Sequence, residues 1–142
     1  MRSKAPLALM EQVVMVLVFA LAAAVCLRIF AFSYQMSERN KDIDHAVLLA
    51  QNTAESIKAY GGVEEAAGAT GGEIRQTMWS AYYDAELKPV PDRELACYEV
   101  HTLPVNSGVE GLSRAVIDVL RRDGNEPLFS ITVAWQEVNG IG

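Results

Sequence analysis

Apolar residues dominate the first quarter of the chain. Val13–Leu27 contains fifteen residues without a charge, and the twenty-residue window Val13–Phe32 is interrupted only by Arg28. A helix of that length rises about 30 Å, the thickness of the hydrocarbon core of a bilayer. Arg28 lies near the end of the window, where a long basic side chain can reach the headgroups. The pattern predicts a transmembrane helix.

Beyond Phe32 the pattern becomes that of an amphipathic helix. Residues 33–59 contain no glycine or proline, and apolar residues recur at spacings of three and four, as on one face of a helix. This helix packing stripe consists of Ile43, Val47, Ala50, Ala54 and Ile57. Gly61-Gly62 favour a helix end. We therefore expect one continuous helix whose second half buries its stripe against another element.

Downstream of residue 72, runs typical of strands replace the helical pattern. They span Thr77–Tyr83, Leu95–Leu103, Gly111–Arg121 and Leu128–Val138, and the second and fourth alternate with period 2. Residues 63–72 are interpreted as one short helical turn in a glycine-rich loop. The fold class that satisfies these elements is α+β, in which the long helix packs on a small antiparallel sheet of about four strands.

The connections between the strand-like runs favour a meander. Pro89-Val90-Pro91-Asp92 is a turn signal between the first two runs, and Asp123-Gly124-Asn125 is a hairpin signal between the last two. Pro104–Gly108 is expected to be a looser loop. The chain then has four segments: a leader-like basic head (1–6), the transmembrane helix (7–32), its amphipathic extension (33–60), and a loop with the sheet (61–142).

Charge divides the chain at the same place. The whole chain carries −6, whereas residues 33–142 hold 9 basic and 17 acidic side chains and carry −8. Because phosphate binding needs a basic surface, we expect no nucleic acid partner. Arg2, Lys4 and the α-amine favour a cytoplasmic amino terminus. We expect a single-pass protein of the cell membrane with its carboxy-terminal domain outside the cytoplasm.

Two other forms of processing stay open at this point. Ala22-Ala23-Ala24 fits a signal-peptidase site, but the apolar stretch continues to Phe32 and is longer than a typical signal peptide core. Cys26 follows a sequence that faintly resembles a lipoprotein box, although Val25 is a poor fit before the cysteine. Both alternatives are weaker than the transmembrane helix.

The polar residues suggest no active site. His45 and His101 share no metal-ligand spacing with cysteines or carboxylates, so both are expected on the surface. Asp42 and Asp44 face different directions on a helix. Cys97 is interpreted as a small core residue, with pairing to another chain as the alternative. We expect no enzyme, no cofactor and no metal.

The first residues of the apolar segment carry a family resemblance. Pro6-Leu7-Ala8-Leu9-Met10-Glu11, followed by Gln12-Val13-Val14, resembles the prepilin cleavage and methylation signature of the type IV pilin-like superfamily. The segment Leu48–Lys58 is similar to the later part of the helix in minor pseudopilins, and Leu128–Trp135 is similar to their last strand. The resemblance covers the whole chain in expected architecture, but only residues 6–32 in motif.

The resemblance implies roles for three residues. Cleavage after Pro6 would make Leu7 the first mature residue and Glu11 the glutamate at the fifth mature position. Glu11 would then pair with the amino terminus of a neighbouring subunit and set the assembly register, since a carboxylate in an apolar zone is costly unless paired. The other interpretation places Glu11 at the cytoplasmic interface. Family leaders usually end in Gly, and Pro6 restricts the backbone there, so an uncleaved chain stays open.

The leading hypothesis is a structural subunit, a minor pilin or pseudopilin of a type IV pilus, competence or type II secretion-like filament. Its implied partners are other pilin-like subunits, an inner-membrane assembly platform and, if the chain is processed, a prepilin peptidase. The alternative is a single-pass, membrane-anchored extracytoplasmic binding or sensing module that does not polymerise.

Overall fold

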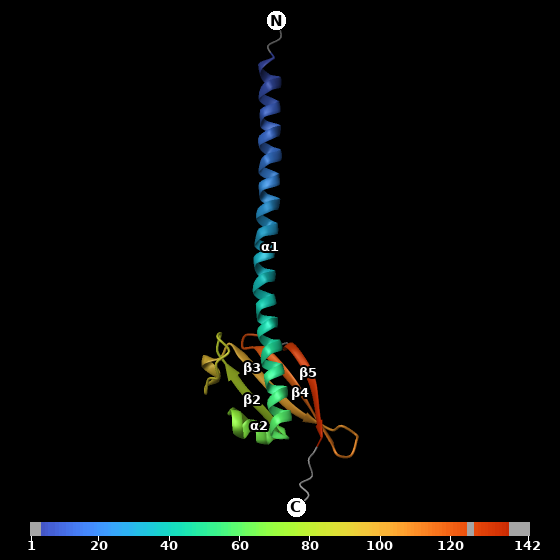
Figure 1. The fold of residues 1–142 in the computed structure, drawn as a ribbon. Coiled ribbons are helices and arrows are strands. Elements are labelled where there is room, and N and C mark those ends of the chain that lie inside the picture. The colour runs from blue at the N-terminus through green and yellow to red at the C-terminus, as the bar shows by residue number, and fades with distance from the viewer. Residues whose placement is uncertain (1–3, 125–126, 137–142) are drawn as a thin grey trace, which may run out of the picture. The chain divides into compact units, whose positions relative to one another are not determined.

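A computed structural model describes residues 4–124 and 127–136. The chain divides into two units, Met1–Asn40 and Lys41–Gly142. One helix, α1 (Ala5–Tyr60), runs through both units (Figure 1). The second unit adds a short helix and an antiparallel sheet, so the expected α+β class is confirmed.

The helix α1 is long because nothing in its sequence interrupts it. Between Leu7 and Tyr60 there is neither glycine nor proline. Pro6 lies in the first turn, where a missing N–H costs no helical hydrogen bond. The helix ends where Gly61 adopts a φ of 83° and donates its N–H to the Ile57 carbonyl at 2.9 Å. The expected continuity of the helix is therefore present in the structure.

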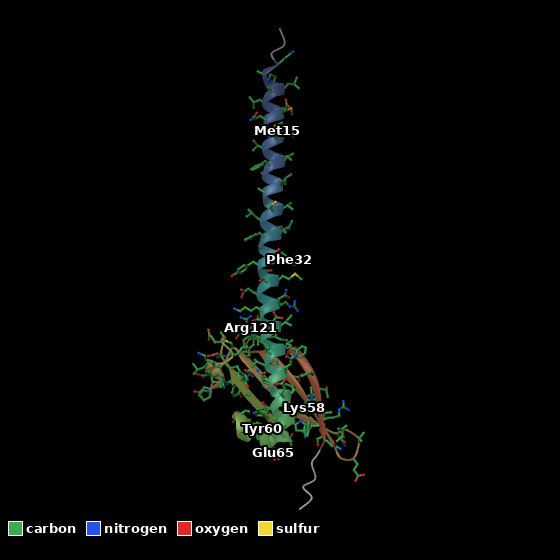
Figure 2. The ribbon with its side chains drawn as sticks, viewed as in Figure 1. Met15, Phe32, Lys58, Tyr60, Glu65 and Arg121 are labelled. Atoms are coloured by element: carbon green, nitrogen blue, oxygen red, sulfur yellow. The ribbon has the colours of Figure 1, made fainter. Side chains whose placement is uncertain are left out.

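The first unit consists of α1 up to Asn40. All described residues from Lys4 to Asn40 are exposed. By length and composition, α1 contains a stretch apolar enough to cross a membrane, and none of that stretch is buried within the protein. Met15 and Phe32 are labelled on this part of α1 in Figure 2, and they are 63% and 64% exposed.

The second unit contains a five-stranded sheet in the order β1-β2-β3-β4-β5, with every neighbouring pair antiparallel. Its elements are α2 (Val63–Thr70), β1 (Glu73–Arg75), β2 (Met78–Tyr83), the 3₁₀ turn η1 (Arg93–Leu95), β3 (Tyr98–Val105), β4 (Leu112–Arg121) and β5 (Pro127–Gln136). The expected meander is present, but the expected number of four strands is wrong. The additional strand, β1, forms a hairpin with β2 through Gln76 and Thr77.

Some element bounds also differ from the expectation. Leu95 belongs to η1 and is exposed, so β3 begins only at Tyr98. At its other end β3 includes the first two residues of the expected loop, because Pro104 pairs with Ala115 and Val105 with Arg114 in β4. The expected helical turn is the two-turn helix α2. The expected end of the last strand, Val138, lies outside the described residues.

The core of the second unit lies between α1 and one face of the sheet (Figure 1). The helix buries Ala46, Leu49, Ala50, Thr53, Ala54 and Ile57. Of the expected helix packing stripe, Ala50, Ala54 and Ile57 are buried, whereas Ile43 and Val47 are half-buried. The strands contribute chiefly Trp79, Tyr98, Val100, Ala115, Ile117, Val119 and Val133. We call the sheet face that carries these residues the helix-facing face, and the opposite face the outer face.

The interpretation of Cys97 as a core residue is wrong. Cys97 precedes β3 and is exposed, whereas its neighbours Ala96 and Tyr98 are buried. Because side chains alternate along an extended backbone, burial of these two neighbours turns the cysteine outward.

Candidate functional site

The residues singled out by the family resemblance lie in the first two turns of α1. Pro6, Leu7 and Glu11 are all exposed, and Leu7 is 75% exposed. The Glu11 carboxylate makes no ion pair or hydrogen bond with any described residue, and it is the only acidic side chain between Lys4 and Ser37. The structure thus brings these three residues onto one apolar, exposed helix without a partner for the acid.

Large apolar side chains surround Glu11 on the same helix. Those more than half exposed include Leu9, Met10, Val13, Val14, Val16, Leu17, Val18, Phe19, Leu21, Val25, Leu27, Ile29 and Phe30. A water-soluble domain does not leave such a surface uncovered, because the free energy falls when an apolar group is removed from water. Chemically, this surface can enter lipid or pack against other apolar helices.

A second group of polar residues ties α1 to the sheet. We call Asp42, His45, Tyr98 and Arg121 the anchor cluster. Tyr98 at the start of β3 and Arg121 at the end of β4 are cross-strand partners. The Tyr98 hydroxyl donates to Oδ1 of Asp42 at 2.7 Å, and Nη1 of Arg121 donates to Oδ2 at 2.6 Å. Each carboxylate oxygen therefore accepts one hydrogen bond from the sheet.

His45, one helical turn beyond Asp42, completes the anchor cluster. Its Nδ1 lies 3.1 Å from the Tyr98 hydroxyl oxygen, and the two rings meet edge to face with centroids 5.6 Å apart. Because the Tyr98 hydroxyl gives its hydrogen to Asp42, we assign the hydrogen of this contact to Nδ1 of His45. His45 is half-buried, so the expectation of an ordinary surface histidine is wrong.

The electrostatics of the anchor cluster favour a neutral tyrosine. Burial raises the pKa of Tyr98, and the hydrogen bond to the Asp42 carboxylate and its negative charge raise this pKa further. The positive charge of Arg121 opposes these effects only in part. A tyrosine held in its protonated state donates a hydrogen bond and serves a structural role.

On the outer face of the sheet one acidic side chain is buried. Glu99 in β3 is 3% exposed, and its Oε1 accepts from Nε of Arg93 at 2.7 Å. Nε2 of His101 lies 3.3 Å from Oε2 of Glu99. The hydrogen bond to Glu99 and the negative charge of Glu99 raise the pKa of Arg93. Because a buried carboxylate needs a partner, Arg93 holds η1 against the sheet.

A cleft in the second unit has a volume of about 500 Å³. It lies between the α1–α2 connection and the strands β3, β4 and β5, with Glu64, Glu65 and Arg114 as charged lining residues and Trp135 as the aromatic one. Its charged lining residues carry both signs. Among the residues that the structure describes, no group of three histidine, cysteine or acidic side chains is placed to hold a metal ion.

The anchor cluster was not anticipated from the sequence. The sequence argues against Asp42 and Asp44 as a carboxylate pair, and it places Tyr98 and Arg121 only in predicted strands. The available signal was the spacing of Asp42 and His45, which places two polar groups one turn apart at the start of the apolar stripe. Two polar groups at the edge of a buried helix face need hydrogen-bond partners on the element that packs against that face.

Comparison of the chain with protein-family models, with curated proteins and with solved structures found no match.

Proposed function

We propose that this protein is a structural subunit of a pilin-like filament, a minor pilin or pseudopilin of a type IV pilus, competence or type II secretion-like system. The observation that carries the proposal is the position of Glu11, an acid with no partner among the described residues, four residues after Leu7 in the exposed apolar part of α1. A small α+β domain follows on the same helix, and this order of elements also supports the proposal.

The chemistry of Glu11 explains how such a subunit would assemble. A carboxylate within an apolar helix is expensive in lipid unless it meets a positive charge. Cleavage after Pro6 creates a positive α-amine on Leu7, and the amine of a neighbouring subunit is a suitable partner for Glu11. Apolar helices pack side by side in any register, whereas one ion pair per subunit selects a single register.

The proposal also fixes where the protein acts. The chain is inserted once in the cell membrane, with the amino terminus in the cytoplasm and residues 41–142 outside it. A prepilin peptidase removes residues 1–6, and an inner-membrane assembly platform adds the subunit to the filament.

Mass spectrometry of the membrane-extracted protein tests processing. We expect a mature chain that begins at N-methylated Leu7 in cells with an active prepilin peptidase. An intact amino-terminal Met1 in those cells would contradict the proposed processing.

Substitution of Glu11 tests assembly. Glu11→Leu should leave membrane insertion intact but strongly reduce recovery of the protein in sheared filaments, because the register-setting charge is lost. Glu11→Asp keeps the charge and is the matched variant that should retain part of the assembly. Glu38→Gln, which removes an acid outside the apolar segment, should have no effect. Equal assembly of Glu11→Leu and the unaltered protein would eliminate the register role.

Pro6 favours a second candidate function, a single-pass anchored binding or sensing module that does not polymerise. A proline before the scissile bond restricts the backbone that a peptidase must accommodate. This candidate predicts an uncleaved chain that is absent from sheared filaments. Replacement Pro6→Gly separates the two candidates. Faster cleavage together with more protein in sheared filaments would show that Pro6 slows the processing of a subunit that assembles.

A further inference from the structure

The two edges of the sheet differ in how they are protected. The β1 edge is only three residues long, and its Glu73 and Arg75 form an ion pair at 2.9 Å. β2 extends beyond β1, and there the loop that follows β2 covers the edge that β1 leaves open. In this loop Val90 donates its N–H to the Tyr82 carbonyl at 2.9 Å. Short length, charge and a covering loop are the usual devices that prevent a sheet edge from pairing with another chain.

The β5 edge lacks nearly all of these devices. Pro127–Gln136 is ten residues long and contains no Asp, Glu, Lys or Arg. It pairs with β4 on one side, and no residue among 4–124 and 127–136 pairs with its other side. Alternate residues of an edge strand point their N–H and C=O groups away from the sheet. Only Pro127 and the register shift at Val119 and Leu120 restrict pairing, and both lie at one end.

We propose that β5 is a docking edge that receives an extended, uncharged segment of another protein as a sixth strand. Main-chain hydrogen bonds along β5 supply the affinity, as in other cases of strand addition. The flanking side chains define the sequence that fits. Ile131 is half-buried on the helix-facing face, whereas Ser130 and Thr132 are exposed on the outer face. The incoming segment therefore alternates apolar and small polar residues.

A second copy of this chain is a poor occupant of the edge. Antiparallel pairing of β5 with itself requires a twofold axis perpendicular to the sheet, and this axis reverses residues 41–60 of α1 in the second copy. Two chains anchored in one membrane need these helical segments to run in the same direction. The β1 edge of a second copy offers only three residues and a charged pair. This choice of partner rests on the proposed membrane anchoring, whereas the open edge does not.

A synthetic peptide of four Thr-Val repeats, with two lysines at each end, serves as the probe. The full-length protein in detergent is mixed with the peptide, and amide hydrogen exchange is followed by mass spectrometry. We expect saturable binding, with slower exchange in 127–136 and no change in β1 or β2. A Thr-Pro repeat peptide of equal length, which lacks the needed N–H groups, should not bind.

Lysine substitutions locate the binding edge. Thr132→Lys places a charge beside the incoming strand and should weaken peptide binding at least threefold. Leu103→Lys adds the same charge on the outer face of a central strand, where Leu103 is 46% exposed, and should leave binding unchanged. If Thr132→Lys fails to fold by circular dichroism, Ala134→Lys at a second exposed position of β5 gives the same test.

Three results would overturn the proposal. One is the absence of protection in 127–136, and another is equal weakening by Thr132→Lys and Leu103→Lys. The third is a dimer without peptide that Thr132→Lys dissociates, since the edge would then belong to a second copy. None of these measurements involves Leu7 or Glu11. A negative result for peptide binding therefore does not contradict the filament proposal, and a negative result for the Glu11 variants does not contradict the docking edge.

Discussion

The hydroxyl of Tyr98 and the carboxylate of Asp42 meet at 2.7 Å although 56 residues separate them in the chain. Asp42 lies on α1 and Tyr98 begins β3, so this hydrogen bond joins the helix directly to a central strand of the sheet. Arg121, paired with Tyr98 across β3 and β4, contacts the other oxygen of the same carboxylate. One acidic side chain thus fixes the helix against two strands.

Replacing Tyr98 with Phe removes the hydroxyl and keeps the ring. We expect Tyr98→Phe to lower the free energy of unfolding by about 1.5–3 kcal/mol, the range for a hydrogen bond to a charged group. Urea unfolding of the detergent-solubilised protein measures this change. The matched control is Tyr82→Phe, since no described residue hydrogen-bonds to the Tyr82 hydroxyl, and its effect should be much smaller. Equal effects of the two variants would show that the Asp42 contact contributes nothing.

The raised pKa of Tyr98 predicts a loss of stability at alkaline pH. The folded protein holds the Tyr98 proton more tightly than the unfolded chain, whose tyrosines titrate near pH 10. The contribution of this proton to stability is therefore full below pH 10 and is lost as the pH rises above 10. Urea midpoints at pH 8 and pH 10.5 measure this loss.

The variant Tyr98→Phe tests which residue causes the alkaline loss. Burial also raises the pKa of Tyr83, and that contribution is present in both proteins. We expect the decrease in midpoint between pH 8 and pH 10.5 to be smaller in Tyr98→Phe than in the unaltered protein. An identical decrease would assign the alkaline transition to other groups.

Replacement of Thr102 should raise the free energy of unfolding instead of lowering it. Its side chain is fully buried in β3, and its Oγ1 has no hydrogen-bond partner among the described residues. A buried hydroxyl without a partner costs free energy, and valine has the same shape without the hydroxyl. We expect Thr102→Val to raise the free energy of unfolding by roughly 0.5–2 kcal/mol. Destabilisation by this variant would indicate that the hydroxyl has a partner after all.

Two glycines should respond to alanine with opposite signs. Gly68 is exposed within α2, and an added Cβ meets nothing within 4 Å, so Gly68→Ala should stabilise by about 0.5–1 kcal/mol through helix propensity. Gly72 has a φ of 112°, and an added Cβ would lie 2.5 Å from Nε1 of Trp79. Gly72→Ala should destabilise by about 2–4 kcal/mol.

Trp79 fluorescence during urea unfolding measures the free energy of unfolding of both glycine variants. It reports folding because Nε1 of Trp79 donates to the Gly71 carbonyl at 3.0 Å in the folded protein. The two substitutions add the same methyl group four residues apart. Stabilisation by Gly72→Ala would contradict the backbone conformation and close contact described at Gly72, and destabilisation by Gly68→Ala would contradict the open, helical site described at Gly68.

The helix and most of the sheet were predictable because they rest on local patterns. The uninterrupted run up to Tyr60 and the period-2 alternation after Tyr98 each reflect which side of an element meets a core. The predicted helix packing stripe is narrower than the buried face of α1. Ala46 is too small to stand out from its neighbours, and Thr53 is polar, yet both are buried. Thr53 satisfies its hydroxyl on the Leu49 carbonyl at 2.8 Å, which makes its burial inexpensive.

The features missed in the sequence depend on the backbone or on distant partners. The β1–β2 turn uses Gln76 with a φ of 59°, where glycine or asparagine would have signalled a hairpin. The anchor cluster depends on the register that sets Tyr98 opposite Arg121, and a single-residue shift would turn one of them to the other face. Exposure of Cys97 follows from its alternation with the buried Ala96 and Tyr98, and the sequence pattern does not show which of the two alternating sets of side chains faces the helix.

The uncharged edge of β5 also has a consequence for the life of the protein in the cell. Open, apolar strand edges are templates for aggregation, and cells recognise such chains with chaperones and proteases. A copy made in excess of whatever occupies β5 would therefore be short-lived. Degradation of the excess would then set the ratio of this protein to its partner. The abundance of the protein would follow that of the partner without any control of synthesis.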